Sequence, residues 1–261
     1  MTTVISFANI KGGVGKTTSC VNVAAILAKD HGRRVLLCDL DPQGNATAGL
    51  GVDPARLSVT AYDVLHNPRQ CGAAIMSTAW AGLDLLPANL DLAAAELELA
   101  ARPGREARLR LALADLPTPP YDYVLIDTPP SLGLFTQSAL MASRWVIAPA
   151  EASYYSLNAL RQLRELVDLI TPFNERLEVL GVLLTRVDRR ANFSADVETL
   201  LRQTLGNLVF TETIPANIRA AEAPAAGQPV TIYAPDSSSA QAYRRLVDEV
   251  IYRIEATNEQ A

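Results

Sequence analysis

The 261-residue chain has 49% hydrophobic and 20% charged residues, enough apolar material for one well-buried core. Its formal net charge of -5 argues against a generally basic surface, so contact with nucleic acid would need a local patch. Cys20, Cys38 and Cys71 form no C-x-x-C pair, which disfavours a disulfide framework, a zinc site or an iron–sulfur cluster within one chain. This cysteine usage is typical of a reducing cytosol, and we expect a cytoplasmic protein.

The N-terminal segment has no basic region followed by a long apolar run. No stretch reaches the roughly 18 uninterrupted apolar residues that are needed to span a bilayer. The sequence therefore predicts an unprocessed, soluble protein without a membrane partner.

Short apolar runs alternate with segments of helical periodicity, a pattern typical of βα units that form a mostly parallel, twisted sheet with helices on both faces. We predict strands at Val4–Ile10, Arg33–Leu40, Leu83–Pro87, Tyr123–Asp127, Trp145–Pro149, Val179–Leu184 and Val209–Ile214. We predict helices at Thr17–Asp30, Leu90–Ala101, Glu106–Leu116, Leu132–Ala142, Leu157–Thr171, Ser194–Leu205 and Ser239–Glu255. Because no flexible linker divides the chain, we expect a single α/β domain over residues 1–261, with no separate N-terminal helix-turn-helix segment.

A glycine-rich loop joins the first predicted strand to the first predicted helix, and it reads Lys11-Gly12-Gly13-Val14-Gly15-Lys16-Thr17-Thr18. Strand, glycine loop and helix in this order form the context of a phosphate-binding P-loop. The glycines permit the backbone to turn successive N–H groups toward one point, and the helix start adds its positive dipole end. We therefore predict that Lys16 contacts the β and γ phosphates of a nucleotide and that the Thr17 hydroxyl binds Mg²⁺.

Lysine is rare in this chain, since only three of the 23 basic residues are lysines. Two of them, Lys11 and Lys16, lie in the loop, and the third is Lys29. An ammonium group is a compact charge that fits between phosphate oxygens better than a planar guanidinium does. This bias favours phosphate contacts by both loop lysines.

Two apolar strands end in aspartates, one in Asp39-Leu40-Asp41 and the other in Asp127. Open α/β sheets bind ligands at the carboxyl ends of their strands. An apolar strand that ends in Asp is also the Walker B arrangement, in which the carboxylate supports the metal through water, and we assign that role to Asp127. The alternative, that either carboxylate only caps its following loop, stays open.

The usual P-loop motif G-x-x-x-x-G-K-[ST] has glycine where this chain has Ile10, and a second lysine, Lys11, stands before Gly12. In this respect the chain resembles the deviant Walker A family, which includes the ParA and Soj partition ATPases, MinD and the nitrogenase iron protein. Three blocks extend the resemblance to ParA and Soj over nearly the whole chain. They are Asp-Leu-Asp-Pro-Gln-Gly-Asn-Ala-Thr at 39–47, Asp-Thr-Pro-Pro-Ser-Leu-Gly at 127–133, and Ile-Pro-Ala-Asn-Ile-Arg-Ala-Ala-Glu-Ala-Pro at 214–224.

The resemblance implies roles for individual residues in ATP hydrolysis. Lys11 would reach across a dimer interface to the nucleotide of the facing chain. Asp41 would position or activate the attacking water, with Asp39 as a supporting group. Pro215 and Asn217 would line the adenine pocket, and the segment 185–188 would border the base.

The same resemblance implies partners and regulation. The protein would be an ATPase with weak intrinsic activity that forms an ATP-dependent homodimer and binds double-stranded DNA without sequence preference on the nucleoid. A ParB-like centromere-binding protein would stimulate hydrolysis. Arg190 and Arg219 would belong to the DNA-binding patch, because a few arginines suffice for salt-sensitive phosphate contacts. Pairing of such arginines with nearby carboxylates remains an alternative.

The chain departs from the usual ParA pattern at three places. It has Ile10 where Gln is common, Ala216 where Arg is common, and Glu151-Ala152-Ser153-Tyr154-Tyr155 where Gln-x-Glu-Tyr-Tyr is common. These departures affect surface function, such as DNA affinity and partner choice.

Other functions of the same fold are less consistent with the sequence. A metabolic P-loop ligase that uses ATP is the main alternative, but no substrate-binding constellation stands out. A MinD-like positioning ATPase would need a basic amphipathic C-terminal helix, whereas this tail ends polar with one arginine. An iron-protein role would need cysteines in loops, and Cys20 and Cys38 fall in a predicted helix and strand.

Overall fold

A computed structural model describes residues 2–116, 121–153, 156–188 and 192–259, without the side chains of residues 192–195. The strands are β1 (Thr3–Phe7), β2 (Val35–Asp39), β3 (Met76–Ser77), β4 (Leu83–Leu86), β5 (Tyr123–Asp127), β6 (Trp145–Glu151) and β7 (Glu178–Thr185). The helices are α1 (Lys16–Lys29), α2 (Asn45–Gly49), α3 (Ala61–His66), α4 (Cys71–Ala74), α5 (Leu92–Glu98), α6 (Arg108–Ala114), α7 (Leu134–Ala142), α8 (Ser156–Ile170), α9 (Asn192–Leu205), α10 (Ile218–Glu222), α11 (Val230–Tyr233) and α12 (Ser238–Glu259). Short 3-10 turns complete several connections.

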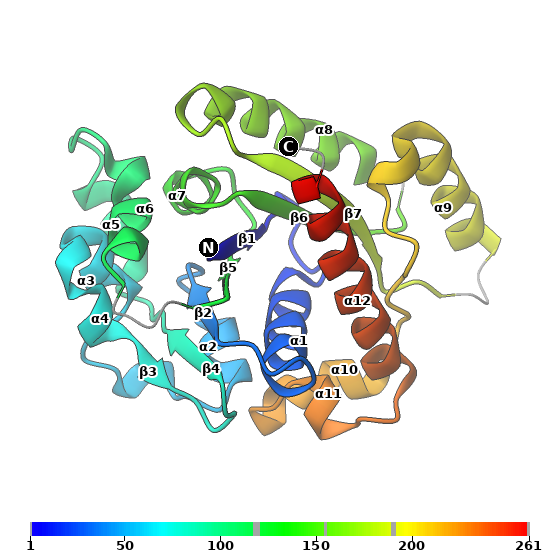
Figure 1. Cartoon of the computed structure of the whole chain (residues 1–261), viewed down its shortest axis with the longest axis horizontal. Coiled ribbons are helices and arrows are strands. Elements are labelled where there is room, and N and C mark those ends of the chain that lie inside the picture. The colour runs from blue at the N-terminus through cyan, green and yellow to red at the C-terminus, as the bar shows by residue number, and fades with distance from the viewer. Residues whose placement is uncertain (1, 117–120, 154–155, 189–191, 260–261) are drawn as a thin grey trace.

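The described strands form one seven-stranded sheet in the order β3-β4-β2-β5-β1-β6-β7. Only β3 pairs antiparallel to its neighbour, and every other pairing is parallel. The predicted fold class, a mostly parallel α/β sheet with helices on both faces, is confirmed. Because β1 lies beside β5 and β5 lies beside β2, the carboxyl ends of these three strands meet at one edge of the sheet (Figure 1).

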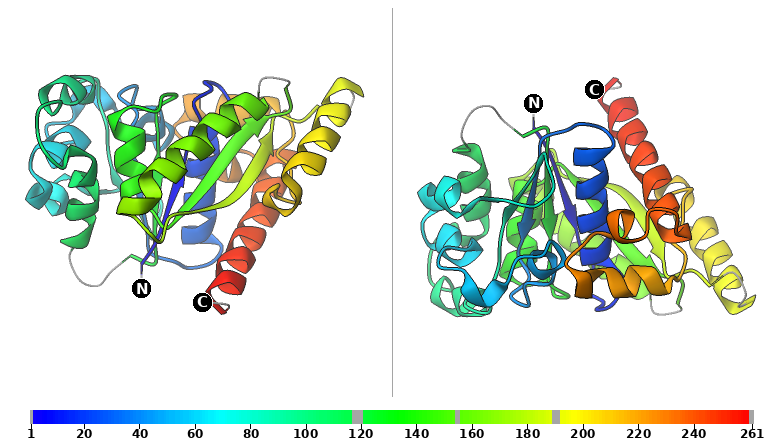
Figure 2. Two further views of the ribbon diagram at one scale, coloured as in Figure 1. Left: turned by 90° about the horizontal axis from the view of Figure 1, so that it is seen from above. Right: turned by 90° about the horizontal axis from the view of Figure 1, so that it is seen from below.

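Alternate residues of each strand face two different hydrophobic layers, as expected of strands covered on both sides. Ile5 and Phe7 of β1 pack in the layer formed with α1 and α12, whereas Val124 and Ile126 of β5 pack in a layer that includes residues of α3, α5, α6 and α7. A third layer joins β6 and β7 to α8. Figure 2 shows α8 and α12 on opposite sides of the sheet.

Six of the seven predicted strands and all seven predicted helices are present, with ends shifted by a few residues. The short elements β3, α2, α3, α4, α10 and α11 are not predicted, because they are too short to show a clear hydrophobic period. The helix α3 does have a local signal, a capping box in which Thr60 and Asp63 bind each other's backbone N–H groups. None of the described helices combines the length and apolar character needed to cross a membrane.

The predicted strand Val209–Ile214 is wrong. The segment touches β7 only at its two ends, through an isolated bridge at Val209 and backbone hydrogen bonds from Phe210 and Ile214. Side chains of two helices bind its middle. Glu249 of α12 accepts hydrogen bonds from the backbone N–H groups of Thr211 and Glu212, at 2.9 and 3.1 Å. Arg202 of α9 donates to the Phe210 carbonyl at 3.0 Å. These side chains take the backbone groups that a continuous strand would pair with β7, so the apolar pattern alone misleads here.

Candidate nucleotide site

The loop between β1 and α1 adopts the geometry that the glycines predict. Gly13 and Gly15 have positive φ values of 73° and 81°, a region that side chains other than glycine rarely adopt. Gly15 is the left-handed N-cap of α1 and has no side-chain cap, so the first N–H groups of the helix face the loop. Gly12 does not have a positive φ, and a Cβ there would lie 3.8 Å from Cβ of Pro130. The buried side chain of Val14 anchors the loop in the core.

Lys16 and Thr17 begin α1 and point to the same edge of the sheet. The Lys16 side chain is 6% exposed, and its ammonium donates to the Lys11 carbonyl at 3.2 Å. Burial lowers the pKa of Lys16, while the nearby charges of Asp127 and Asp41 oppose that shift. The Thr17 hydroxyl donates to Oδ2 of Asp127 at 2.7 Å. The structure thus brings the predicted phosphate lysine, the predicted metal hydroxyl and the predicted Walker B carboxylate together.

Asp39 and Asp127 are register partners on the neighbouring strands β2 and β5, and both are fully buried. Burial raises the pKa of Asp127 well above its ordinary value, and the charge of Asp39 adds to the rise. Burial likewise raises the pKa of Asp39, to about 6, although hydrogen bonds from Thr47 and Asp41 oppose it. Two neighbouring buried carboxyl groups with raised pKa values would be stabilised as carboxylates by a cation.

The residues present fit Mg²⁺ bound together with a phosphate. Oδ1 of Asp127 is buried without a hydrogen-bond partner, and Oδ2 holds the Thr17 hydroxyl. Oxygen ligands of this kind suit Mg²⁺, which usually takes one or two protein ligands and completes its shell with water and substrate phosphate. The described residues contain no group of three or more His, Cys, Asp or Glu side chains that could hold a metal alone. Phosphate oxygens would therefore have to supply part of the coordination.

Asp41 lies beyond the end of β2 and lines the cleft, with 7% exposure. Its Oδ1 accepts a hydrogen bond from the Gln43 N–H at 3.0 Å, and its own N–H donates to Oδ1 of Asp39 at 3.0 Å. Asp39 also accepts from both the N–H and the hydroxyl of Thr47, at 2.9 and 2.8 Å. Asp39 therefore fixes the backbone that carries Asp41, and its supporting role in hydrolysis stays a prediction.

Thr47 and Thr185 hold the site in ways that sequence reasoning did not identify. The Thr47 hydroxyl accepts from the Ala88 N–H at 3.0 Å and so ties α2 to the end of β4. The Thr185 hydroxyl, at the end of β7, donates to the Val14 carbonyl at 2.8 Å. Arg186 donates to the Gly13 carbonyl at 3.2 Å from a backbone with a φ of 54°, unusual for a residue other than glycine. Thr47 and Thr185 fall in the segments 39–47 and 185–188, which the resemblance had already marked. Only the tertiary structure shows which backbone groups their hydroxyls bind.

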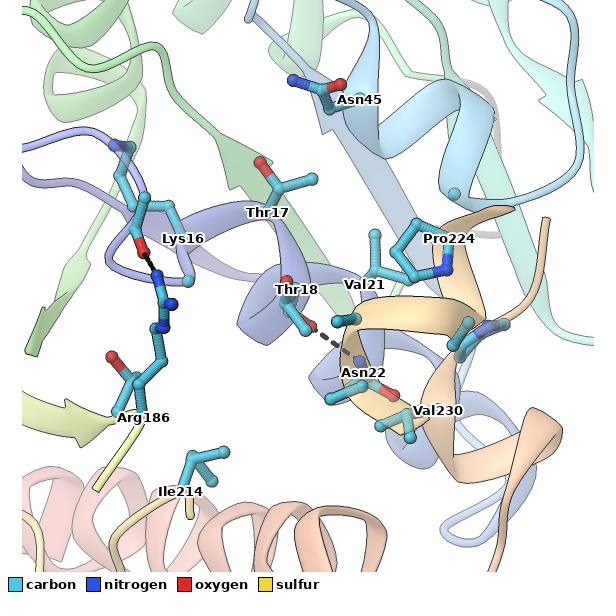
Figure 3. Close-up of a pocket in the computed structure, with 18 of the residues that line it drawn as sticks. Lys16, Thr17, Thr18, Val21, Asn22, Asn45, Arg186, Ile214, Pro224 and Val230 are labelled. Carbon is cyan, nitrogen blue, oxygen red and sulfur yellow. Dashed lines mark hydrogen bonds between the residues drawn. The ribbon is translucent and has the colours of Figure 1, made fainter. Parts of the chain in front are cut away.

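A cleft of about 1090 Å³ runs from the loop across the start of α1 (Figure 3). Lys16 and Thr17 line it at the loop, Asp41 also lines it, and Arg186, directly after β7, reaches toward the loop. Away from the loop the cleft is lined by Val21, Pro224 and Val230, and its lining also includes the mainly apolar set Ile214, Pro215, Asn217 and Ile218. A polar, anion-binding end and an apolar end in one cleft suit a nucleotide, whose base is flat and largely apolar.

The two residues predicted to border adenine, Pro215 and Asn217, both line this cleft. Asn217 also caps α10, because its Oδ1 accepts from the Arg219 N–H at 2.8 Å, and its Nδ2 donates to Ser238 at 2.9 Å. The predicted DNA-binding arginines have different outcomes. Arg219 is exposed and paired with Glu222 at 2.8 Å, whereas Arg190 lies outside the described residues.

The Lys11 side chain is bound to two side chains that lie far away in the sequence. Its ammonium lies 2.9 Å from Oε2 of Glu151 and 3.1 Å from the Ser153 hydroxyl, both of the same chain. The predicted contact of Lys11 with the nucleotide of a facing chain stays a prediction.

Comparison with known proteins agrees with this geometry. The AAA domain family matches residues 2–179. The sporulation initiation inhibitor protein Soj of Bacillus subtilis is 43% identical over 95% of this chain and 97% of its own length. The chromosome partitioning protein ParA of Caulobacter vibrioides is 42% identical over 96% of this chain and 94% of its own length.

Among solved structures, a cobyrinic acid a,c-diamide synthase from Mycobacterium smegmatis with bound ATP analogue and magnesium superposes with a TM-score of 0.85. It is 37% identical and covers 98% of this chain and 97% of its own. The matches to Soj and ParA cover nearly the whole chain, and the family match includes the loop with two lysines. The chain belongs to the ParA and Soj family of P-loop proteins.

Proposed function

We propose that this protein is a DNA-partitioning ATPase that binds ATP with Mg²⁺ and hydrolyses it to ADP and phosphate. The β and γ phosphates lie in the loop of residues 11–18, where Lys16 compensates their charge, and the base lies against Pro215 and Asn217. Thr17 and, through water, Asp127 would hold Mg²⁺, which would supply positive charge to the phosphate oxygens. Asp41 orients the attacking water from the end of β2.

One observation carries this proposal: the buried Oδ1 of Asp127 without a partner, beside a Thr17 hydroxyl at the start of α1. A buried charged oxygen without a partner is costly, and such sites persist where function requires them. The fold places a carboxylate, a hydroxyl and an ammonium at one helix start, which is the set that a Mg²⁺–triphosphate complex needs. The magnesium and ATP analogue named in the similar solved structure support the same assignment.

Family membership supports a set of partners for this chain. Two chains close around their nucleotides into an ATP-dependent homodimer, in which Lys11 contacts the nucleotide of the facing chain. This dimer binds double-stranded DNA without sequence preference, through a patch that includes Arg190 and Arg219, and so stays on the nucleoid in the cytoplasm. A ParB-like centromere-binding protein stimulates a weak intrinsic hydrolysis and releases the chain. The relatives named as partitioning proteins support this cycle.

Sedimentation of two variants tests the cycle. Asp41→Ala should bind ATP, hydrolyse it poorly and accumulate as a dimer, because the group that orients water is gone while the phosphate contacts remain. Lys11→Ala should stay monomeric with ATP. If Lys11→Ala dimerises with ATP as readily as the parent chain, the proposed contact across the interface is wrong.

A metabolic ligase remains a second candidate, favoured by the similarity to the cobyrinic acid a,c-diamide synthase structure. The two functions differ in what accelerates ATP turnover. A partitioning ATPase responds to DNA together with a ParB-like partner, whereas an a,c-diamide synthase needs a carboxylic acid and a nitrogen donor. Phosphate release measured under both conditions separates them, and stimulation only by the acid and nitrogen donor would contradict our proposal.

A further inference from the structure

Lys11 has a partner within its own chain. Its ammonium donates to Oε2 of Glu151 at 2.9 Å and to the Ser153 hydroxyl at 3.1 Å, although Glu151 lies 140 residues away in the sequence. Both side chains of the ion pair are about one third exposed, at 32% and 35%. An ammonium has three N–H donors, so two of the three are already used.

Hydrogen bonds in the turn that follows β6 fix Glu151 and Ser153. The Glu151 carbonyl accepts from the Ser153 N–H at 2.7 Å and from the Ser156 hydroxyl at 2.5 Å. The hydroxyls of Ser153 and Ser156 lie 3.0 Å apart. A side chain that extends from a hydrogen-bonded turn loses less conformational entropy when it binds than one on a free loop does. The two groups that receive Lys11 are thus arranged in advance.

The charge of Glu151 opposes the function proposed for Lys11. A carboxylate 2.9 Å from the ammonium neutralises it and would repel the triphosphate of a facing chain. Arg186 supplies another cation at this end of the sheet, since its guanidinium binds the Gly13 carbonyl in the same loop. The hydrogen bond from Lys11, the charge of Lys11 and the charge of Arg186 together lower the pKa of Glu151. Glu151 therefore stays ionised, and Arg186 remains as a nearby cation if Lys11 leaves.

We propose that Glu151 and Ser153 form a holder for Lys11 in the free chain, and that Lys11 leaves this holder when two chains close around their nucleotides. The inference rests on the proposed dimer. Glu151 is a positioning residue rather than a catalytic one, because it acts only through Lys11. Closure of a symmetric dimer breaks two such ion pairs, so the strength of the holder sets how readily the dimer forms.

The strength of the dimer tests whether Lys11 leaves Glu151 on closure. Sedimentation equilibrium of the full chain, with a non-hydrolysable ATP analogue and Mg²⁺, should show an about fivefold tighter dimer for Glu151→Gln, because two exposed ion pairs no longer compete. The gain should shrink as salt rises, since exposed charges are screened. Glu178→Gln, which removes the same charge from the exposed amino end of β7, is the matched control and should behave as the parent. Unchanged or weaker dimerisation of Glu151→Gln would overturn the release step.

Lysine labelling tests the holder without any dimer. The chain has only Lys11, Lys16 and Lys29, so an amine-reactive ester at limiting concentration gives a simple peptide map. In the ligand-free parent, Lys11 should react slowly relative to the exposed Lys29, and the ratio should rise about threefold in Glu151→Gln. An unchanged ratio would overturn the holder. If the ratio rises in Glu151→Gln but the parent chain does not dimerise with the analogue, the result would contradict the proposed dimer and leave the holder in place.

Discussion

Lys16 and Asp127 are opposite charges that the fold removes from water at one point. The Lys16 side chain is 6% exposed and Asp127 is fully buried, yet no direct ion pair between them is formed. Burial lowers the pKa of Lys16 and raises that of Asp127. Each charge therefore costs free energy in the ligand-free chain, and a Mg²⁺–nucleotide complex bound as we propose would compensate both.

Lys16→Ala should abolish ATP binding, because it removes the ammonium that lies at the terminal phosphates and leaves their charge uncompensated. A fluorescent-nucleotide titration measures this loss, which we expect to exceed 100-fold, about 3 kcal/mol or more. Lys29→Ala, at the exposed end of α1, is the control and should bind as the parent does. If Lys16→Ala binds ATP with unchanged affinity, the proposed contact of Lys16 with the phosphates is wrong.

Asp127→Asn should stabilise the ligand-free chain while weakening its Mg²⁺-dependent ATP affinity. Because the pKa of Asp127 is raised on folding, the folded chain is penalised for the ionised carboxylate at pH values above that raised pKa. The substitution removes this penalty, so the gain is largest at alkaline pH and shrinks as the pH falls. Scanning calorimetry at pH 8 should show a melting temperature higher by roughly 2–4 °C, which corresponds to about 1 kcal/mol.

The exposed Asp115 provides the control, since Asp115→Asn should change neither the melting temperature nor nucleotide binding. A destabilised Asp127→Asn chain would mean that the Thr17 hydrogen bond outweighs the cost of the buried charge.

At the scale of elements, the carboxyl end of β7 supports the P-loop through hydrogen bonds. Its last residue, Thr185, binds the Val14 carbonyl, and Arg186 binds the Gly13 carbonyl. β7 is an edge strand of the sheet, two positions from β1, so these bonds reach across β6. The loop conformation consequently depends on a strand that lies far from it in sequence.

Thr185→Val should weaken ATP binding by about three- to tenfold, because the side chain keeps its shape but no longer donates to the Val14 carbonyl. Thr185→Ser retains the hydroxyl and is the matched variant, which should bind close to the parent. Nucleotide titration, with a melting curve for each variant, separates a local effect from unfolding. Equal affinities for the valine and serine variants would show that this hydrogen bond does not support the loop.

For the molecule as a whole, a net charge of -5 means that the proposed DNA binding has to rest on a local patch. Arg219 lies on α10 beside the cleft and is paired with Glu222 at 2.8 Å. One such patch offers few phosphate contacts, and they are screened at physiological salt, where the Debye length is about 8 Å. Two patches on one face of a dimer roughly double the contacts and steepen the salt dependence.

Charge reversal tests this patch in the ATP-bound dimer. Arg219→Glu and Arg190→Glu should each reduce binding to unrelated duplexes about equally, with dimerisation intact, in filter-binding assays over a salt series. Arg161→Glu, on the exposed side of α8 at the opposite face of the sheet, is the control. Unaltered binding by both reversals would place the patch elsewhere, and strong preference for one sequence would favour a repressor-like role.

The sequence by itself determined the features whose causes are local. The positive φ of Gly13 and Gly15, the strand before them and the helix after them depend on neighbouring residues, and the strand ends at Asp39 and Asp127 follow from short apolar runs. These features were enough to predict a parallel α/β sheet with a phosphate loop and carboxylates at one edge.

Only the tertiary structure decided which distant groups meet. The run 209–214 has the pattern of a strand, yet side chains of α9 and α12 bind its backbone, and a propensity argument has no access to those neighbours. Lys11 could be assigned to the loop from its position, but its ion pair with Glu151 depends on where β6 ends in space. The physical reason is the same in both cases: hydrogen bonds and charges act over a few ångströms, and sequence separation does not predict that distance.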